Sequence, residues 1–298
     1  MAEDRWRLGE ETTGILFMLG AGLMFIFIDV GMKTLAAGYA ILQVAWARYA
    51  FQVVLVPLIV GRRGRARGLR SRRPGLQVGR SLFLLGATLA TILALRYIPL
   101  AETNAISKVG PLFVTALSIP LLAERVGPRR WIAVVVGFAG ALIIIRPGAA
   151  TTHWAMFLPL VAALCFAFYQ ITTRKLAAID PPETTLLYTA LAGALLLSAV
   201  VPFVWRWPDA AGWAVMAGIG AAGAGGHLLL ILAFRRAEAS TLAPMSYVTL
   251  IWATLLGLVF FGDFPDLWTI VGALVIAASG VYVFYREAAL ARRPARPI

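Results

Sequence analysis

The sequence predicts an all-α polytopic membrane protein: ten transmembrane helices, arranged as two inverted five-helix repeats around a central cavity. Three observations support this fold class, namely an apolar composition, ten apolar runs of spanning length and a similarity between the two halves of the chain. Of the 298 residues, 60% are hydrophobic and only 14% are charged. A soluble domain of this size cannot bury that much apolar surface, so a lipid environment is expected.

Ten runs of mostly apolar residues each approach the length of about 20 residues that a bilayer-spanning helix needs. The runs end at Gly, Pro and charged residues, as in ERVGPRR, IDPPE and GDFPD, which are typical of turns at helix ends. The connecting segments are short, so no extramembrane domain is expected. The predicted spans are 14–35, 39–60, 78–97, 101–122, 131–146, 154–175, 184–204, 211–234, 239–261 and 266–286.

The formal net charge of +13 comes from Lys and Arg that lie in short clusters between the apolar runs. Such clusters are typical of cytoplasmic loops, so nucleic acid is not expected as a partner. With the Arg-rich segment 61–80 placed in the cytoplasm, 21 Lys and Arg lie on that side and 4 on the other. This distribution predicts a bacterial inner-membrane protein with both termini cytoplasmic. The single cysteine, Cys165, excludes an intramolecular disulfide.

An internal similarity divides the chain into repeats 1–150 and 151–298. Residues 94–117 match residues 233–256 at an offset of 139, which aligns Ser107 with Ser246 and Lys108 with Tyr247. Each half holds five predicted spans. Because five is odd, the second half enters the membrane from the opposite side, and a pseudo-two-fold axis in the membrane plane relates the halves, as in many secondary transporters. Chance similarity between apolar helices is the alternative.

Three charged residues are predicted to lie inside the bilayer: Asp29, Arg48 and Lys108. At 1.5 Å per residue they lie about 9 to 14 Å below the outer surface. One acid and two cations leave a spare positive charge, which would attract a carboxylate or a phosphate. Lys108 has no acid within one turn of its own helix, so we expect its ammonium to pair with Asp29 when the site is empty. In the structural alternative, Asp29 pairs with Lys33 and Arg48 binds helix carbonyls.

The other candidate substrate-binding residues are Asn104, Tyr169, Gln170, Tyr247, Trp252 and His227. Gln170 and Tyr247 are the repeat partners of Asp29 and Lys108, so the inner half of the pathway is predicted to be neutral. Such a pathway suits a substrate with an ionic head and a body that stacks on rings, although packing is the alternative for each ring. His227 could carry protons, or it could be a neutral histidine bonded to a carbonyl.

No catalytic or metal-binding pattern is found. Gly218, Gly220 and Gly223 spell G-x-G-x-x-G, but they lie inside an apolar run with no preceding strand, so they are expected to allow close helix packing. No P-loop, metal-ligand spacing or Ser-His-Asp order is present. The sequence therefore predicts no cofactor, no metal and no enzymatic activity.

Several segments are similar to those of a known family. Each half has a helix ending in an acid, Glu124 in LLAER and Asp263 in VFFGDF, followed by a Gly-containing helix, WIAVVVGFAGALIIIRPG or LWTIVGALVIAASGVYVFYRE. With WARYAFQVVLVPL in the second span, the chain resembles the EamA-type members of the drug/metabolite transporter superfamily. The resemblance implies ten helices around a cavity and export or exchange of small metabolites, with YddG-type amino-acid exporters as one branch. The second half departs from it in having no counterpart of Arg48.

Together these features predict a secondary transporter that exports a small metabolite, with an amino acid favoured, by alternating access. Its expected partners are that substrate and the lipid bilayer, with proton or ion coupling, and its expected state is a monomer or homodimer. A carrier of a sugar, a nucleotide derivative or a lipid head group is the alternative within this class. A membrane-embedded lipid-modifying enzyme is the alternative from another class, and it would need an acid-base or metal site near an interface.

Overall fold

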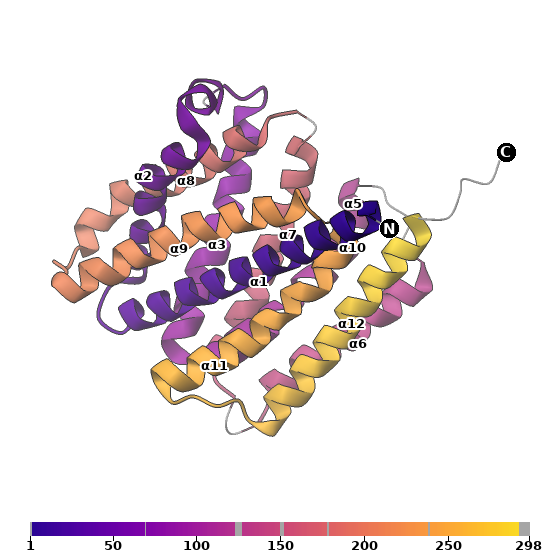
Figure 1. Cartoon of the computed structure of the whole chain (residues 1–298). Coiled ribbons are helices and arrows are strands. Elements are labelled where there is room, and N and C mark those ends of the chain that lie inside the picture. The colour runs from indigo at the N-terminus through magenta and orange to yellow at the C-terminus, as the bar shows by residue number, and fades with distance from the viewer. Residues whose placement is uncertain are drawn as a thin grey trace.

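The computed structural model describes residues 2–68, 70–122, 127–149, 152–177, 179–237 and 239–291, whose regular elements are all helices (Figure 1). The α-helices are α1 (Ala2–Ala36), α2 (Ile41–Gly68), α3 (Pro74–Tyr97), α4 (Leu100–Ser107), α5 (Gly110–Leu122), α6 (Pro128–Ile145), α7 (Leu158–Ala177), α8 (Pro182–Val200), α9 (Ala210–Phe234), α10 (Ala239–Leu242), α11 (Thr249–Phe261) and α12 (Leu267–Ala291). Three short 3₁₀ helices are η1 (Trp154–Phe157), η2 (Val201–Val204) and η3 (Ala243–Val248).

All ten predicted spans correspond to helical segments. Among the described residues, nine segments are long and apolar enough to cross a membrane, and a tenth apolar segment, Ile41–Val56 of α2, is shorter. The fourth and ninth spans are not continuous helices as predicted. The fourth breaks between α4 and α5, at Lys108 and Val109, and the ninth changes from α-helix to 3₁₀ helix over η3. Pro111 and Pro244 lie at these two places, and proline disfavours α-helical geometry in the residue before it.

The two halves interlock in the way that an inverted repeat requires. The most extensive packing is between α1 and α9, α3 and α7, α2 and α8, and α6 and α12. Counted as spans, the first packs on the eighth and its repeat partner, the sixth, packs on the third. The second and seventh spans, and the fifth and tenth, each pack on their own repeat partner. This pairing is unchanged when the halves are exchanged, so it matches a pseudo-two-fold relation between them.

Glycines permit the closest of these contacts. A Cβ atom added at Gly272 of α12 would lie 2.5 Å from the carbonyl oxygen of Gly140 in α6. In α9, a Cβ at Gly220 would lie 2.2 Å from Phe51, and one at Gly223 would lie 2.4 Å from Gln52. The G-x-G-x-x-G segment therefore packs α9 against α2, as close-packing glycines do in membrane helices.

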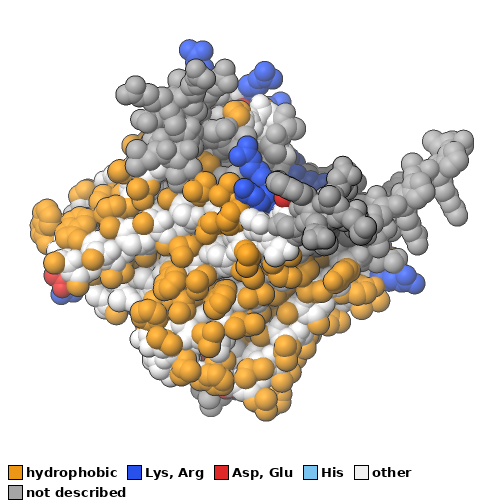
Figure 2. Space-filling view, viewed as in Figure 1, with side chains coloured by type: hydrophobic (Ala, Val, Ile, Leu, Met, Phe, Trp, Pro, Cys, Tyr) orange, Lys and Arg blue, Asp and Glu red, His pale blue; other side chains and the backbone are white. Residues whose placement is uncertain are grey.

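The bundle has two ends that differ in charge. One end holds the α2–α3 and α7–α8 connections, and we call it the basic end. The other end holds the α1–α2, α8–α9 and α11–α12 connections, and we call it the opposite end. Helix α1 begins, and α12 ends, at the basic end (Figure 1). Hydrophobic side chains cover much of the face formed by α1, α9, α11 and α12, and most of the Lys and Arg visible on that face lie toward the basic end (Figure 2). Large apolar side chains such as Val259 and Leu195 are 73% and 69% exposed, as expected of a surface covered by lipid.

Candidate functional site

A cavity of about 170 Å³ lies among α1, α2, α3, α4 and α7, near the middle of the membrane-spanning segments. Asp29 of α1 and Arg48 of α2 bring charges of opposite sign to its wall, and hydroxyls come from α3 and α4. The lining consists of Asp29, Met32, Arg48, Leu84, Ala87, Thr88, Thr91, Ser107, Ala162, Ala163 and Phe166. Charged side chains inside a membrane protein face such cavities, and they mark candidate substrate pathways.

Arg48 keeps unused hydrogen-bonding capacity at this cavity. Its Nη1 donates to Thr88 Oγ1 at 3.1 Å, and that hydroxyl lies 3.0 Å from the Tyr49 hydroxyl. The buried Arg48 Nε has no hydrogen-bond partner among the described residues. A buried donor without a partner is costly in a low-dielectric environment, so an anionic ligand at this guanidinium would be favourable.

The Asp29 carboxylate is held by a neutral group. Asn104 of α4 donates from Nδ2 to Asp29 Oδ2 at 3.1 Å, and also to the Leu100 carbonyl at 3.2 Å. The alternative pairing of Asp29 with Lys33 is wrong, because Lys33 Nζ lies 2.8 Å from Asp263 Oδ2. Among the described residues no ion pair includes Asp29, so its charge is available to a cationic group that enters the cavity.

Lys108 does not pair with Asp29 as expected. Its Nζ donates to the Ser246 carbonyl in η3 at 3.1 Å. The break in the fourth span and the 3₁₀ segment of the ninth explain this difference, because η3 presents a carbonyl that the Lys108 ammonium can reach across the repeat. Lys108 follows Ser107, which lines the cavity. An ammonium has three donors, so Lys108 retains capacity for a second partner.

The remaining candidates do not line this cavity, although the Tyr169 ring stacks on Phe166 of the lining with centroids 5.4 Å apart. Tyr169 binds Arg80, Gln170 follows it on α7 and is half-buried, and the ring of His227 packs edge-on against Phe25 with centroids 5.3 Å apart. Tyr247 lines a separate groove beside α12, and Trp252 packs against the core around α1 and α2. The structure therefore brings Asp29, Arg48 and Asn104 together, but not the aromatic candidates.

Arg80 was counted with the cytoplasmic segment 61–80, although the predicted third span begins at residue 78, and it is not an exposed loop residue. It lies about two turns into α3 and is only 2% exposed. Its guanidinium donates to Tyr169 Oη at 2.7 Å, Thr173 Oγ1 at 2.6 Å, Thr189 Oγ1 at 2.9 Å and the Thr185 carbonyl at 3.2 Å. We call this set the Arg80 cluster. Pro74, a favoured first residue of a helix, is the sequence signal that would have started this helix before residue 78 and so placed Arg80 deeper in it.

The basic end carries a second link between the halves, at Asp180 in the α7–α8 connection. Its carboxylate accepts hydrogen bonds from the Ser71 hydroxyl, the Arg72 N–H at 3.0 Å and Gln77 Nε2 at 2.9 Å. Burial raises the pKa of Asp180, but these hydrogen bonds and the nearby charge of Arg72 outweigh it, so the pKa lies below its usual 3.8. The carboxylate is therefore ionised at neutral pH.

The opposite end is joined by ion pairs. Lys33 of α1 contacts Asp263 at 2.8 Å and the Ile98 carbonyl at 3.3 Å, so it links the first half to the α11–α12 connection. Arg146, after α6, lies 2.7 Å from Asp266 at the start of α12. Glu124, the other acid of the two similar motifs, lies outside the described residues.

Ten spans in two inverted halves, with charged side chains at a cavity in mid-membrane, define the class of secondary transporters. The chain belongs to the EamA-like transporter family, which matches residues 12–146 and 153–285, once in each half. Within the described residues, no group of three or more His, Cys, Asp and Glu is placed to hold a metal ion.

Relatives with assigned substrates resemble the chain over most of its length. It is 27% identical to an S-adenosylmethionine uptake transporter of Rickettsia prowazekii, covering 87% of this chain and 88% of the relative. It is 30% identical to a riboflavin transporter of Vibrio cholerae (94% and 95% covered) and 25% identical to a pseudopaline exporter of Pseudomonas aeruginosa (90% and 94% covered). A crystal structure with 19% identity superposes with a TM-score of 0.62 over 94% of this chain and 99% of that one, which supports the fold alone.

The family and these relatives make the chain a small-molecule transporter of the membrane, and not an enzyme. The alternative of a lipid-modifying enzyme is therefore set aside. The family does not specify an amino acid as the substrate or export as the direction of transport, both of which were expected from the sequence.

Proposed function

We propose that the protein carries a small metabolite with an α-amino-acid head across the bacterial inner membrane by alternating access of the halves 1–150 and 151–298. The supporting observation is the presence of Asp29 and Arg48 in the lining of one cavity without an ion pair between them. Asp29 would receive the substrate's ammonium and Arg48 its carboxylate. A zwitterionic head would then pair with both charges. An unpaired charge inside a membrane is costly, so this pairing would favour binding.

Lys108 would strengthen the site for the carboxylate. With Arg48 it gives the region one more positive than negative charge. Its ammonium donates to the Ser246 carbonyl, and a bound carboxylate would be a stronger partner than that neutral oxygen. The substrate would therefore draw Lys108 toward the cavity and loosen its contact with η3.

The relatives narrow the choice of substrate class when their printed substrates are compared with this cavity. S-adenosylmethionine has an α-amino-acid end and an aromatic base, whereas riboflavin has no carboxylate or ammonium. The charges of Asp29 and Arg48 favour the first type of molecule, and Phe166 in the lining offers a ring for its apolar or aromatic body.

The size of the cavity supports an alternating-access mechanism. At about 170 Å³ it is smaller than typical ligand sites, which are about 300 to 1,000 Å³. Contacts between the halves close both ends of the bundle, through Lys33 and Asp263 at one end and the Arg80 cluster at the other. A substrate would therefore enter only when one of these ends separates.

Transport into proteoliposomes tests this function. The probes are radiolabelled S-adenosylmethionine, phenylalanine, riboflavin and a nucleotide sugar, with protein-free vesicles as the blank. We expect saturable transport of one or both amino-acid-headed compounds. Saturable transport of riboflavin or the nucleotide sugar alone would contradict the proposal. Reversing the substrate gradient, and imposing a pH gradient, measures whether export is favoured and whether protons are coupled.

We also propose that the basic end faces the cytoplasm, together with both termini. The support is the excess of Lys and Arg in the connections at this end. Reporters fused after Arg73 and at the C-terminus should read as cytoplasmic. An external signal from either fusion would contradict this orientation.

A further inference from the structure

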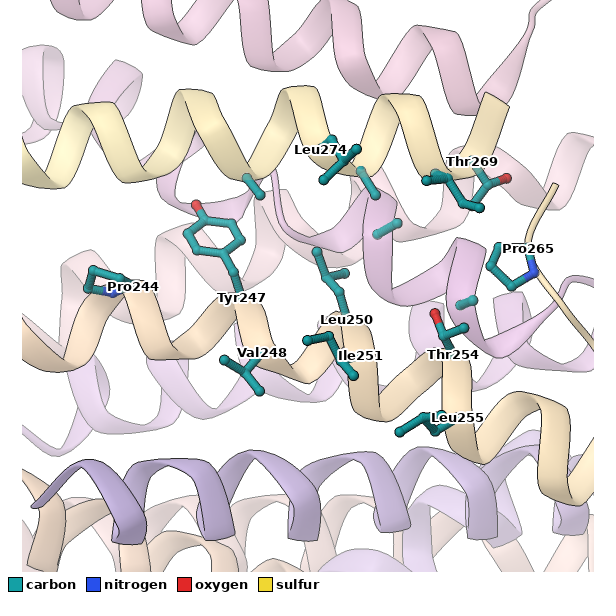
Figure 3. A pocket seen from close by; sticks show the side chains of 15 residues that line it. Pro244, Tyr247, Val248, Leu250, Ile251, Thr254, Leu255, Pro265, Thr269 and Leu274 are labelled. Atoms are coloured by element: carbon teal, nitrogen blue, oxygen red, sulfur yellow. The ribbon is translucent and has the colours of Figure 1, made fainter. Parts of the chain in front are cut away.

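A larger hollow lies on the side of the bundle, apart from the charged cavity. It has a volume of about 480 Å³ and lies between η3–α11 and α12, with α4 behind it (Figure 3). In Figure 3, the side chains of Tyr247, Ile251 and Leu255 line it on one side, and Leu274 and Thr269 line it on the other. We call this feature the lateral groove.

The lateral groove opens to the surrounding lipid. Its rim side chains Ile251, Leu255 and Leu274 are 58%, 46% and 65% exposed, and they belong to membrane-spanning helices. Its floor is formed by Ala101 and Ala105 of α4, which are 5% and 2% exposed. The groove is therefore a depression, floored by small residues, that is continuous with the lipid-facing surface.

The walls of the groove determine what can fill it. Of the fifteen lining residues only Tyr247, Thr254 and Thr269 carry polar side-chain atoms, so water would find few hydrogen-bond partners along most of the groove. Leaving the groove empty would forfeit the packing contacts of every side chain that lines it. The material present around the rim is hydrocarbon, which matches the walls in polarity.

The length of the groove matches one leaflet. It runs from Pro265 and Thr269 at the opposite end of the bundle to the ring of Tyr247 in mid-span (Figure 3). From Thr269 to Ala277, α12 rises about 12 Å at 1.5 Å per residue, and half of a bilayer's hydrocarbon core is about 15 Å. We propose that the lateral groove is a binding site for one acyl chain of a membrane lipid from the leaflet at the opposite end.

A lipid chain in the lateral groove would contact segments of the fourth and ninth spans that are expected to move during transport. The bound chain contacts Tyr247 and Val248 in the 3₁₀ segment of the ninth span, and Ala105, three residues before Lys108 in the fourth. It therefore lies against the two irregular spans that meet through the Lys108–Ser246 contact. The proposal depends on the membrane fold and not on the identity of the transported substrate.

Photolabelling in nanodiscs tests the site. The full-length protein is reconstituted in phosphatidylcholine containing a trace of phosphatidylcholine with a diazirine on one acyl chain, and labelled residues are mapped by mass spectrometry. We expect labelling of Ile251 and Leu274 at least about fivefold above that of other exposed residues of α11 and α12. Ala277→Phe, which fills the groove, should remove this excess. Ala278→Phe, at an exposed neighbour outside the groove, is the matched control and should preserve it.

The outcomes are distinguishable. Uniform labelling of the lipid-facing surface, or equal labelling in Ala277→Phe and Ala278→Phe, would overturn the proposal. A groove that stays unlabelled while the surrounding surface is labelled would also overturn it, and would indicate a second copy of the chain as the occupant. If Ala277→Phe does not yield folded protein, Ala273→Leu adds fewer atoms to the same wall and is used in its place.

Discussion

The two ends of the bundle are closed by different chemistry. The opposite end of the bundle is joined by two ion pairs. The side chains of Lys33 and Asp263 are 16% and 33% exposed, and those of Arg146 and Asp266 are 30% and 42% exposed. At the basic end, the 2%-exposed Arg80 donates to hydroxyls and a carbonyl, and Asp180 accepts from neutral donors and a backbone N–H. The opposite end also has a buried amide, Gln43, which exchanges two hydrogen bonds with the Arg206 backbone, but its charged contacts are partly hydrated ion pairs. At the basic end, single buried charges are held by hydrogen bonds.

This difference predicts which end separates more readily. A partly exposed ion pair contributes about 0.2 to 1 kcal/mol and is weakened by salt, because water and ions compensate its charges when it breaks. Separating Arg80 from its acceptors leaves a buried guanidinium unpaired, which costs more. From the closed arrangement seen here, we therefore expect the opposite end to open first.

The largest effect is expected at Arg80. Arg80→Lys keeps the charge but cannot reproduce the four hydrogen bonds of the guanidinium fork, so it should lose about 2 to 3 kcal/mol of stability. Thermal unfolding of the purified protein measures the loss. Arg73→Lys changes an exposed arginine at the same end and should have no comparable effect. Equal melting temperatures for the two variants would show that the Arg80 cluster does not hold this end.

Between the two ends, the charge of Lys108 is expected to govern transport. Lys108→Met keeps the length of the side chain and removes its ammonium. Transport of an amino-acid-headed substrate should fall at least about tenfold, which corresponds to about 1.4 kcal/mol for one lost charged contact. The measurement is initial rate in proteoliposomes. Normal rates from well-folded Lys108→Met protein would assign Lys108 to the structural contact with Ser246 alone.

A smaller effect is expected at the opposite end. Lys33→Met and Asp263→Asn should each cost about 1 kcal/mol or less, and a double-mutant cycle should show that the two losses are coupled. Raising the salt concentration should reduce the coupling. The two variants should also increase labelling of a cysteine placed in the α11–α12 connection. Additive losses would mean that the 2.8 Å contact contributes little to closing this end.

The smallest effect at neutral pH concerns Asp180. Because its pKa is below 3.8 in the folded protein, its stabilising contribution is present above the pKa of the unfolded chain and is lost as pH falls through the lower, folded value. The melting temperature of the wild type should therefore drop more between pH 5 and pH 3 than that of Asp180→Asn. Ser71→Ala removes one donor, which brings the folded pKa of Asp180 closer to that of the unfolded chain, so the drop should be smaller than in the wild type. Parallel curves for all three proteins would contradict this assignment.

Hydrophobic run length was enough to predict the ten spans, and an odd number of spans per half was enough to predict their inversion. The approximate depth of Asp29 and Arg48 followed from counting residues along single helices, because each turn of a helix has a fixed rise. That both side chains line the same cavity depends on how the helices pack. Their similar predicted depth was the only sign of this in the sequence.

The differences arose where the partner of a side chain belongs to another helix. Lys108 reaches Ser246 because the fourth span breaks and the ninth changes to a 3₁₀ helix, and hydropathy alone does not distinguish such spans from continuous α-helices. Lys33 meets Asp263, which is 230 positions away in the sequence, and not Asp29, which is one turn away. Arg80 was counted with the cytoplasmic basic residues because the third span was predicted to begin at residue 78, whereas α3 begins at Pro74 and Arg80 binds side chains of two other helices.

The most direct test of the central claim compares two substrates in two proteins. The initial rate for the preferred amino-acid-headed compound is divided by the rate for its analogue without the ammonium group, in the wild type and in Asp29→Asn. If Asp29 receives the ammonium, this ratio should fall at least about tenfold in the variant, the scale of one charged contact. An unchanged ratio in a folded, active Asp29→Asn protein would contradict the claim that this cavity binds the zwitterionic head.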